Sequence, residues 1–241
     1  MIKLKNITCR FSKKTILEDL SLDIPSHLSI LGANGSGKST LAKIICNLVD
    51  FDGAVVVNDK EIHEYTLKER AKLLSYIPAK LDVYDSFITL DEFVLLGRYA
   101  HKNSLLDYSF TDKKIAKECL EFLDIEHLSS NTLHSLSSGE TQLALIAQAL
   151  SQQSKIIIFD EPTANLDPRN SKIIAQHIKS LQEYHQVILI THDIALAAFI
   201  GAPVAFVKNK KVSLYAKEFF EKEKLQELYE VNFEKFGVQF A

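Results

Sequence analysis

This 241-residue chain has few cysteines and no surplus of basic residues. Its three cysteines, Cys9, Cys46 and Cys119, are odd in number and widely scattered, which argues against a disulfide framework or a cysteine metal site. They are typical of small buried residues in a reducing compartment. Because 28 Lys and Arg stand against 31 Asp and Glu, the net charge of −3 gives no electrostatic case for nucleic acid as a partner.

Long apolar runs are missing as well. The longest, such as Val187–Ile190 and Val204–Val207, are far too short to cross a bilayer. No charged and then apolar leader opens the chain, so we expect no signal peptide. We find no internal repeat and no low-complexity segment. These absences, together with an ordinary 46% hydrophobic content, predict a cytoplasmic globular protein with a substantial core.

The strongest motif lies in Leu31–Thr40, which fits the phosphate-binding pattern G-x-x-x-x-G-K-[ST]. Glycines let backbone N–H groups approach a triphosphate closely, and the helix that follows adds the positive end of its dipole. Lys38 is predicted to reach the β- and γ-phosphates, and the Ser39 hydroxyl to hold Mg²⁺. The predicted phosphate-binding residues are Gly32, Ala33, Asn34, Gly35, Ser36, Gly37, Lys38, Ser39 and Thr40.

Both flanks of this loop fit the motif. Leu28–Leu31 before it is a short, mostly apolar run that suits a strand. Leu41–Val49 after it has apolar residues at helical spacing, including Leu48. A flexible Gly/Ser turn with a stray lysine would require neither flank. We therefore predict that the chain binds a nucleoside triphosphate.

Residues 1–76 are predicted to be rich in strands around one central helix. Apolar and polar residues alternate before Pro25, and Asn58-Asp59 predicts the turn of a hairpin. Phe11 ends one such alternation, so its pattern alone favours a side chain that points into the core.

The middle of the chain is predicted to be helical, and the end to alternate strands with helices. Helices are expected over Thr89–Tyr99, from Asp112 as a possible cap to Leu123, and over Glu140–Leu150. From Lys155 onward, buried strands alternate with helices, which is typical of a parallel or mixed sheet covered on both faces. A charged amphipathic helix and tail are expected over Ala216–Phe236.

Acidic residues follow the predicted strand Ile156–Phe159 directly. In open α/β sheets, ligands bind at the carboxyl ends of the strands. Asp160 suits the holding of Mg²⁺, and Glu161 suits the orientation or deprotonation of an attacking water. His192 follows the next strand and is expected at the same edge, where an imidazole could bind the γ-phosphate or the water. A capping acidic pair and an incidental histidine are the structural alternatives.

A second glycine-containing turn opens a helix at Leu136–Glu140. It is a potential phosphate site, although Ser-Ser-Gly-Glu is also an ordinary helix cap. One chain does not need two phosphate sites, which suggests that two chains share them.

Taken in order, these residues resemble an ATP-binding cassette (ABC) ATPase along nearly the full length of the chain. The resemblance implies that Gly32–Ser39 is the Walker A loop and Ile156–Asp160 the Walker B strand. It also implies that Phe11 stacks on adenine, that Glu161 is the catalytic glutamate and that His192 is the switch histidine.

The resemblance further implies a head-to-tail dimer that sandwiches two ATP molecules. Leu136–Glu140 then corresponds to the LSGGQ signature of the second copy. Ala164–Asp167 corresponds to the D-loop, and Asp167 is its predicted site residue. The residues expected to contact ATP in trans are Ser137, Ser138, Gly139 and Glu140.

Finer details resemble the importer group for iron–siderophore complexes, haem and vitamin B12. They are Leu96-Gly97-Arg98 followed by His101, and the pair His192-Asp193. Importers of zinc or manganese share much of this pattern and remain an alternative. The group implies ATP and Mg²⁺ as cofactors, a membrane permease as partner, an indirect role for a substrate-binding protein, and a peripheral position on the cytoplasmic face of the inner cell membrane.

Two motifs depart from the family pattern, the signature and the segment after Pro78. Ser138 and Glu140 stand where the signature usually has glycine and glutamine, which are small or isosteric changes. Ala79 stands where a glutamine usually touches Mg²⁺ and water and relays to the transporter. We therefore keep a second hypothesis, an ATP-responsive regulatory subunit that hydrolyses poorly. Non-transport ABC proteins are disfavoured, because the chain has neither long coiled coils nor tandem cassettes.

The predicted fold is an α/β P-loop NTPase core with a mixed or parallel sheet, an N-terminal antiparallel β subdomain and an inserted α-helical subdomain. We expect one domain over residues 1–241, in which 1–78 and 154–241 form the nucleotide-binding core and 79–153 the helical subdomain.

Overall fold

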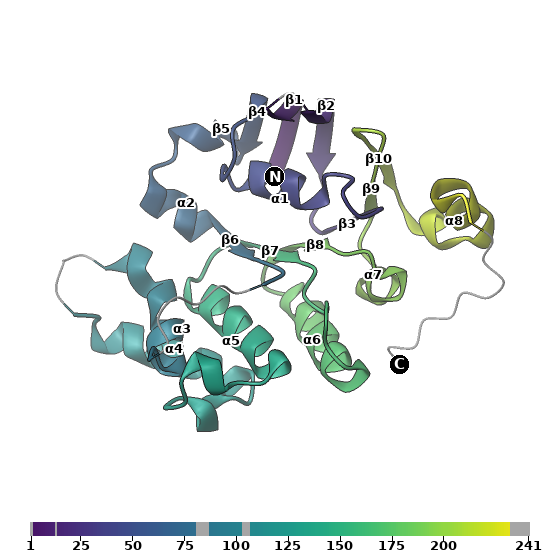
Figure 1. Cartoon of the computed structure of the whole chain (residues 1–241). Helices are drawn as coiled ribbons and strands as arrows, with labels where there is room; N and C mark the ends of the chain where they lie inside the picture. The colour runs from purple at the N-terminus through teal and green to yellow at the C-terminus, as the bar shows by residue number, and fades with distance from the viewer. Residues whose placement is uncertain (1, 13, 81–86, 103–106, 232–241) are drawn as a thin grey trace.

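Two β-sheets carry the helices in the computed structural model, which describes residues 2–12, 14–80, 87–102 and 107–231 (Figure 1). The antiparallel sheet has the order β2-β1-β4-β5 and consists of β1 (Ile2–Phe11), β2 (Lys14–Ile24), β4 (Asp52–Val57) and β5 (Lys60–Glu61). The larger sheet has the order β10-β9-β3-β8-β7-β6. Its strands are β3 (Leu28–Gly32), β6 (Leu74–Ile77), β7 (Ile156–Asp160), β8 (Gln186–Ile190), β9 (Val204–Lys208) and β10 (Lys211–Tyr215).

The larger sheet is mixed, as predicted. β3, β6, β7, β8 and β9 pair in parallel, whereas β10 pairs antiparallel with β9. β6 and β7 are neighbours although about 80 residues separate them in sequence, and the predicted helical subdomain 79–153 lies in that interval. The predicted α/β class is confirmed. The subdomain boundaries at residues 78 and 154 are a proposal.

The central strands of this sheet are apolar on both faces. Side chains alternate across a strand, so Ile156 and Ile158 of β7 enter the core beneath the antiparallel sheet. Ile157 and Phe159 point the other way, into a second core built with the helices. A strand with two buried faces needs a continuous apolar run, which explains the sequence of β7.

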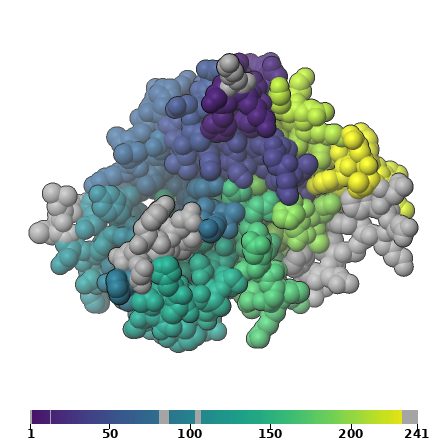
Figure 2. Space-filling model, in the orientation of Figure 1, coloured from purple at the N-terminus to yellow at the C-terminus, as the bar shows by residue number. Residues whose placement is uncertain are grey.

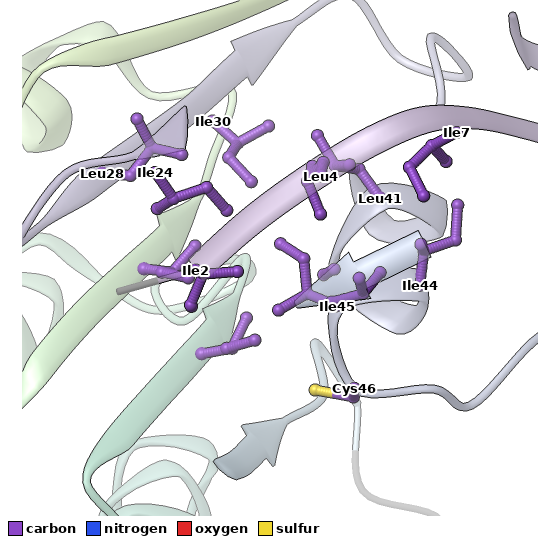
Figure 3. Close-up of a cluster of buried hydrophobic side chains, with 14 of the residues drawn as sticks. Ile2, Leu4, Ile7, Ile24, Leu28, Ile30, Leu41, Ile44, Ile45 and Cys46 are labelled. Atoms are coloured by element: carbon purple, nitrogen blue, oxygen red, sulfur yellow. The ribbon is translucent and has the colours of Figure 1, made fainter. Parts of the chain in front are cut away.

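The first core encloses α1 (Lys38–Ile45) between the two sheets (Figures 1 and 3). Leu41, Ile44 and Ile45 of this helix are fully buried against strand residues such as Ile2 and Leu4. In the left-handed conformation, with φ 54°, Asn47 ends the helix, so Leu48 is exposed rather than part of the predicted apolar stripe. The helix that carries the phosphate loop is thereby held on both sides.

Helices cover the opposite face of the larger sheet (Figure 1). In the space-filling view the helical region after β6 forms the lower part of the molecule, and the antiparallel sheet forms the top (Figure 2). The helices beyond α1 are α2 (Leu67–Leu73), α3 (Leu90–Leu95), α4 (Phe110–Phe122), α5 (Ser138–Ser151), α6 (Pro168–Leu181), α7 (Ile194–Ile200) and α8 (Lys222–Tyr229), with a 3₁₀ turn η2 (Leu96–His101) after α3.

Several local predictions need correction. Ser109 caps α4, and Asp112 is the third residue of the helix, whose side chain completes the capping box. The helix expected over Thr89–Tyr99 is α3 followed by η2, and Gly97 lies in η2, where a Cβ would clash with Ser151 Oγ. Residues 1–76 contain α2 in addition to the expected helix α1. Of the expected helix over Ala216–Phe236, the structure shows α8 after a 3₁₀ turn, and residues 232–236 lie outside the described residues.

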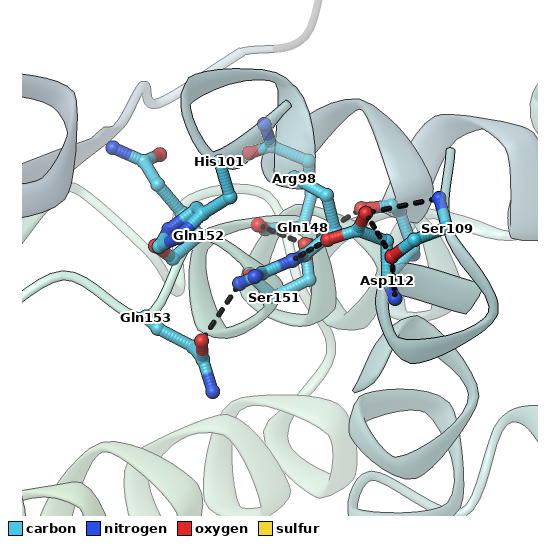
Figure 4. A network of polar contacts seen from close by, with 9 residues as sticks. Arg98, His101, Ser109, Asp112, Gln148, Ser151, Gln152 and Gln153 are labelled. Atoms are coloured by element: carbon cyan, nitrogen blue, oxygen red, sulfur yellow. Dashed lines mark hydrogen bonds and ion pairs between the residues drawn. The ribbon is translucent and has the colours of Figure 1, made fainter. Parts of the chain in front are cut away.

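A buried ion pair between Arg98 of η2 and Asp112 of α4 lies at the end of α5 (Figure 4). Arg98 Nε donates to Asp112 Oδ1 at 3.0 Å, and Arg98 Nη1 donates to the carbonyl oxygen of Ser151 at 2.7 Å. Burial acts to raise the pKa of Asp112, but hydrogen bonds from Ser109 and Arg98 outweigh it and lower that pKa. The Asp112 carboxylate is therefore held ionised beside the arginine.

We expect Arg98→Met to destabilise the protein by about 3–5 kcal/mol, because it leaves the Asp112 carboxylate buried without its cation. Arg10→Met is the matched control, since the Arg10–Asp52 pair is exposed and worth at most about 1 kcal/mol. Urea unfolding followed by circular dichroism measures both losses. Equal losses in the two variants would contradict the structural role of the buried pair.

Candidate active site

The predicted site residues gather at one edge of the larger sheet. The phosphate loop follows β3, Asp160 and Glu161 lie at the end of β7, and His192 follows β8. Because β3, β8 and β7 are parallel neighbours, their carboxyl ends share this edge.

The glycines of the phosphate loop have the backbone geometry that the motif requires. Gly35 and Gly37 have φ values of 76° and 107°, which side chains rarely permit. At Gly32, a Cβ would lie 2.4 Å from the carbonyl oxygen of Val207 on β9, so the loop can leave the sheet only through glycine. Gly37 is also the N-cap of α1, which aims the N-terminus of that helix into the loop.

The ammonium of Lys38 is buried within the loop, with 6% of the residue exposed. Its Nζ donates to the carbonyl oxygens of Gly32 at 2.9 Å and of Ala33 at 3.1 Å. Burial lowers the pKa of Lys38, whereas the nearby Glu161 and Asp160 carboxylates act to raise it. A buried cation that the backbone holds in the centre of a turn is suited to an anionic ligand.

Asp160 is 3% exposed and receives a hydrogen bond at each carboxylate oxygen. The Ser39 hydroxyl donates to Oδ1 at 3.0 Å, and the Tyr76 phenol donates to Oδ2 at 2.7 Å. Burial raises the pKa of Tyr76, and its hydrogen bond to Asp160 adds to the effect, so the phenol keeps its proton. The predicted pair Ser39 and Asp160 is thus brought together by segments about 120 residues apart in sequence.

Glu161 and His192 also meet. Nδ1 of the imidazole lies 2.8 Å from Glu161 Oε2, and the backbone N–H of His192 donates to the same oxygen at 3.3 Å. Glu161 adopts φ 50°, an unusual value for a residue with a side chain, and its N–H donates to the carbonyl oxygen of Ile190 at 2.8 Å. This backbone directs a partly exposed carboxylate toward the end of β8.

Phe11 lies at the tip of the β1–β2 hairpin and is 49% exposed, so its interpretation as a core residue is wrong. The same hairpin reaches the phosphate loop, since a Cβ on Gly37 would approach Ile16 Cγ2 at 2.9 Å. An exposed aromatic ring beside a phosphate loop can stack on a planar group.

The predicted signature residues form the N-terminus of α5. Ser137 is its N-cap, and Glu140 completes a capping box by accepting the Ser137 N–H at 2.7 Å. Hydrogen bonds from Ser137 lower the pKa of Glu140. These residues bond to each other rather than to the phosphate loop, and α5 lies on the other side of the larger sheet from α1 (Figure 1). Ser138 and Gly139 are the first residues of the helix.

Asp167 is the N-cap of α6 and accepts hydrogen bonds from the N–H groups of Arg169 and Asn170. The Asn170 amide group also donates to Asp167 at 2.6 Å, and these bonds lower the pKa of Asp167, the backbone bond from Asn170 most strongly. The Asn170 side chain packs against Gly139, where a Cβ would come within 2.7 Å of it. The predicted D-loop and signature are therefore adjacent in one chain.

Sequence reasoning missed Tyr76 and Thr191. Tyr76 reaches Asp160 from β6, and Thr191 is fully buried next to Glu161. A polar residue inside or directly after an apolar strand was the available signal for both, but only the strand order places them at this edge.

The arrangement combines a cation, a hydroxyl–carboxylate pair and a carboxylate–imidazole pair. Among the residues that the structure describes, no group of three or more His, Cys, Asp or Glu side chains could hold a metal. One buried carboxylate and one hydroxyl nevertheless fit Mg²⁺, which takes few protein ligands and completes its shell with water and phosphate oxygens.

Comparisons with known proteins agree with this geometry. A family model described as ABC transporter matches residues 17–164. The probable iron chelatin transport ATP-binding protein of Helicobacter pylori is 33% identical over 222 residues, 90% of this chain and 87% of that protein. The fold matches an inward-facing ABC transporter of the metal-chelate type with a TM-score of 0.83, at 24% identity over 96% of this chain and 89% of that one. A dimeric bacterial ABC transporter cassette matches with a TM-score of 0.76, at 29% identity over 88% of this chain and 97% of that one. The chain therefore belongs to the ABC transporter family, as its ATP-binding ATPase component.

Proposed function

We propose that this ATPase energises a membrane importer of metal chelates, with iron–siderophore, haem or cobalamin-type complexes as the solute. The observation that carries the ATP-hydrolysing part of the proposal is the convergence of Lys38, the Ser39–Asp160 pair and the Glu161–His192 pair at one sheet edge. The Helicobacter pylori relative, a probable iron chelatin transport ATP-binding protein, supports the class of solute.

In the proposed ATP complex, the backbone N–H groups of Gly32–Thr40 and the N-terminus of α1 bind the phosphates. Lys38 exchanges the loop carbonyls for β- and γ-phosphate oxygens. Phe11 stacks on the adenine from the hairpin tip.

Ser39 and Asp160 would hold Mg²⁺, which neutralises charge on the phosphates when it is bound. Glu161 orients or deprotonates the attacking water, and His192 fixes the Glu161 carboxylate through its imidazole and its backbone N–H.

A second copy of the chain completes the site. In this proposal Ser137, Ser138, Gly139 and Glu140 of one copy face the ATP bound to the phosphate loop of the other, with Asp167 between them. The dimeric cassette of 29% identity supports a second copy as partner, and we propose that the two copies pair head to tail. Because α5 and α1 lie on opposite sides of the sheet, one chain alone does not bring the two halves together.

The partner in the membrane is proposed to be a permease, with a substrate-binding protein acting indirectly. In the described part of the chain, no helix is both long and apolar enough to cross a bilayer. A groove between α2 and η2 is lined by Leu67, Leu96 and Tyr99, which are 76%, 46% and 65% exposed. A neighbouring depression is lined by Leu96 and by Phe87, which is 85% exposed. Exposed apolar residues so close together suit a docking surface, here on the cytoplasmic face of the inner membrane.

An importer of zinc or manganese and a poorly hydrolysing regulatory subunit are the other candidates. The second rests on Ala79, which follows β6 and has no polar side-chain atom near Asp160.

Glu161→Gln should lower kcat for ATP hydrolysis at least 100-fold, because the side chain can no longer accept a proton. ATP-bound dimers should then accumulate and appear by size-exclusion chromatography. Glu183→Gln, an equal change of charge at an exposed turn, should leave both measurements as in the wild type. Persistent full hydrolysis by Glu161→Gln would refute the role of Glu161.

Tyr99→Asp should abolish co-purification with the permease partner, and chelate uptake into proteoliposomes, because it places a charge in the proposed docking groove. Tyr184→Asp is the matched control, since Tyr184 is 76% exposed on the turn after α6. Both variants should keep the wild-type unfolding temperature. Retained permease binding by Tyr99→Asp would rule out this surface.

Ala79→Gln should raise the transport-coupled ATPase rate if the absent glutamine limits hydrolysis or coupling. The measurement is phosphate release by the reconstituted transporter with and without solute, and Ala216→Gln at an exposed position is the control. An unchanged rate would mean that the glutamine is not needed here.

A further inference from the structure

The Walker B carboxylate of Asp160 accepts one of its two side-chain hydrogen bonds from a residue outside the phosphate loop. Asp160 Oδ1 accepts from Ser39 of the phosphate loop, whereas Oδ2 accepts from Tyr76 at 2.7 Å. Tyr76 comes from β6, which pairs with β7 so that Tyr76 stands opposite Ile158. The partly buried ring of Tyr76 packs against the first core, and this packing fixes the position of its hydroxyl.

A carboxylate as buried as Asp160 needs hydrogen bonds to keep its charge and its orientation. Ser39 has a second task in the proposed function, because its hydroxyl is a magnesium ligand. The Tyr76 phenol has no such second task. The orientation of Asp160 during nucleotide binding therefore depends on Tyr76.

In the described part of the chain at the end of β6, the other side chains do not hydrogen-bond to the site, so the Tyr76 hydroxyl is the contribution of this strand. Ala79 supplies no polar side-chain atom, and the Ser75 hydroxyl donates to the carbonyl oxygen of Ala149, away from the site. Among the described residues 74–79, Tyr76 is the one whose side chain hydrogen-bonds to a residue of the candidate active site.

We propose that Tyr76 is a positioning residue that orients Asp160 for Mg²⁺, so that β6 contributes to the metal site through a phenol held in the core. The proposal rests on the proposed function as a magnesium-dependent ATPase. Tyr76 acts through Asp160 and touches neither the nucleotide nor the metal.

The test is Mn²⁺ binding to the complex of the protein with a non-hydrolysable ATP analogue, measured in electron paramagnetic resonance as the loss of free-ion signal beyond the loss that the analogue alone causes. Mn²⁺ takes the same oxygen ligands as Mg²⁺. Tyr76→Phe removes one oxygen and should weaken Mn²⁺ binding about 10-fold or more, the usual effect of losing a group that orients a metal ligand. Binding of the analogue in excess chelator should be unchanged.

Tyr65→Phe is the matched control. Its phenol donates to the carbonyl oxygen of Val57 at 2.7 Å, and its ring packs on the same core without contact with Asp160. This variant should bind Mn²⁺ as the wild type does. In an Asp160→Asn background, Tyr76→Phe should cause no further loss, because its effect passes through the carboxylate.

Equal Mn²⁺ affinity in Tyr76→Phe and wild type would overturn the proposal, as would equal weakening in Tyr65→Phe. If Tyr76→Phe does not fold, Tyr76→Met fills the core without a donor and decides the question by the same titration. Failure of the proposed function is a separate result: the wild type itself would then show no nucleotide-dependent Mn²⁺ binding.

Discussion

The burial of the central strands on both faces is the constraint on which the rest of this structure depends. β7 and β8 alternate residues between two apolar cores, so neither strand can carry a polar group along its length. Polar chemistry is left to the strand ends. That is where Asp160, Thr191 and the phosphate loop lie, and their shared edge follows directly from the parallel pairing.

The electrostatics of this edge follow from the same burial. Lys38 and Asp160 are both almost fully buried, and each is satisfied by hydrogen bonds from or to its surroundings. Burial lowers the pKa of Lys38, while the nearby Glu161 and Asp160 carboxylates act to raise it. A site of this kind is ready for a highly charged ligand that brings its own counter-ion.

The sequence predicts the parts of the site that contiguous residues encode. The phosphate loop, Asp160 and Glu161 are recognisable because each motif lies beside its own strand. Tyr76 could not be assigned, because its contact with Asp160 depends on the pairing of β6 with β7 across a long insertion. Short-range errors have local causes. Asn47 adopts the left-handed conformation and ends α1 before Leu48, although the apolar spacing in the sequence permits a longer helix.

The absence of a side chain at Gly139 has a consequence for assembly. The Asn170 side chain packs against Gly139 and also donates a hydrogen bond to Asp167. The start of α5 and the start of α6 are therefore held in contact within the isolated chain. Whatever surface these two helix ends present to another molecule is preorganised, and little conformational entropy is lost when it is used.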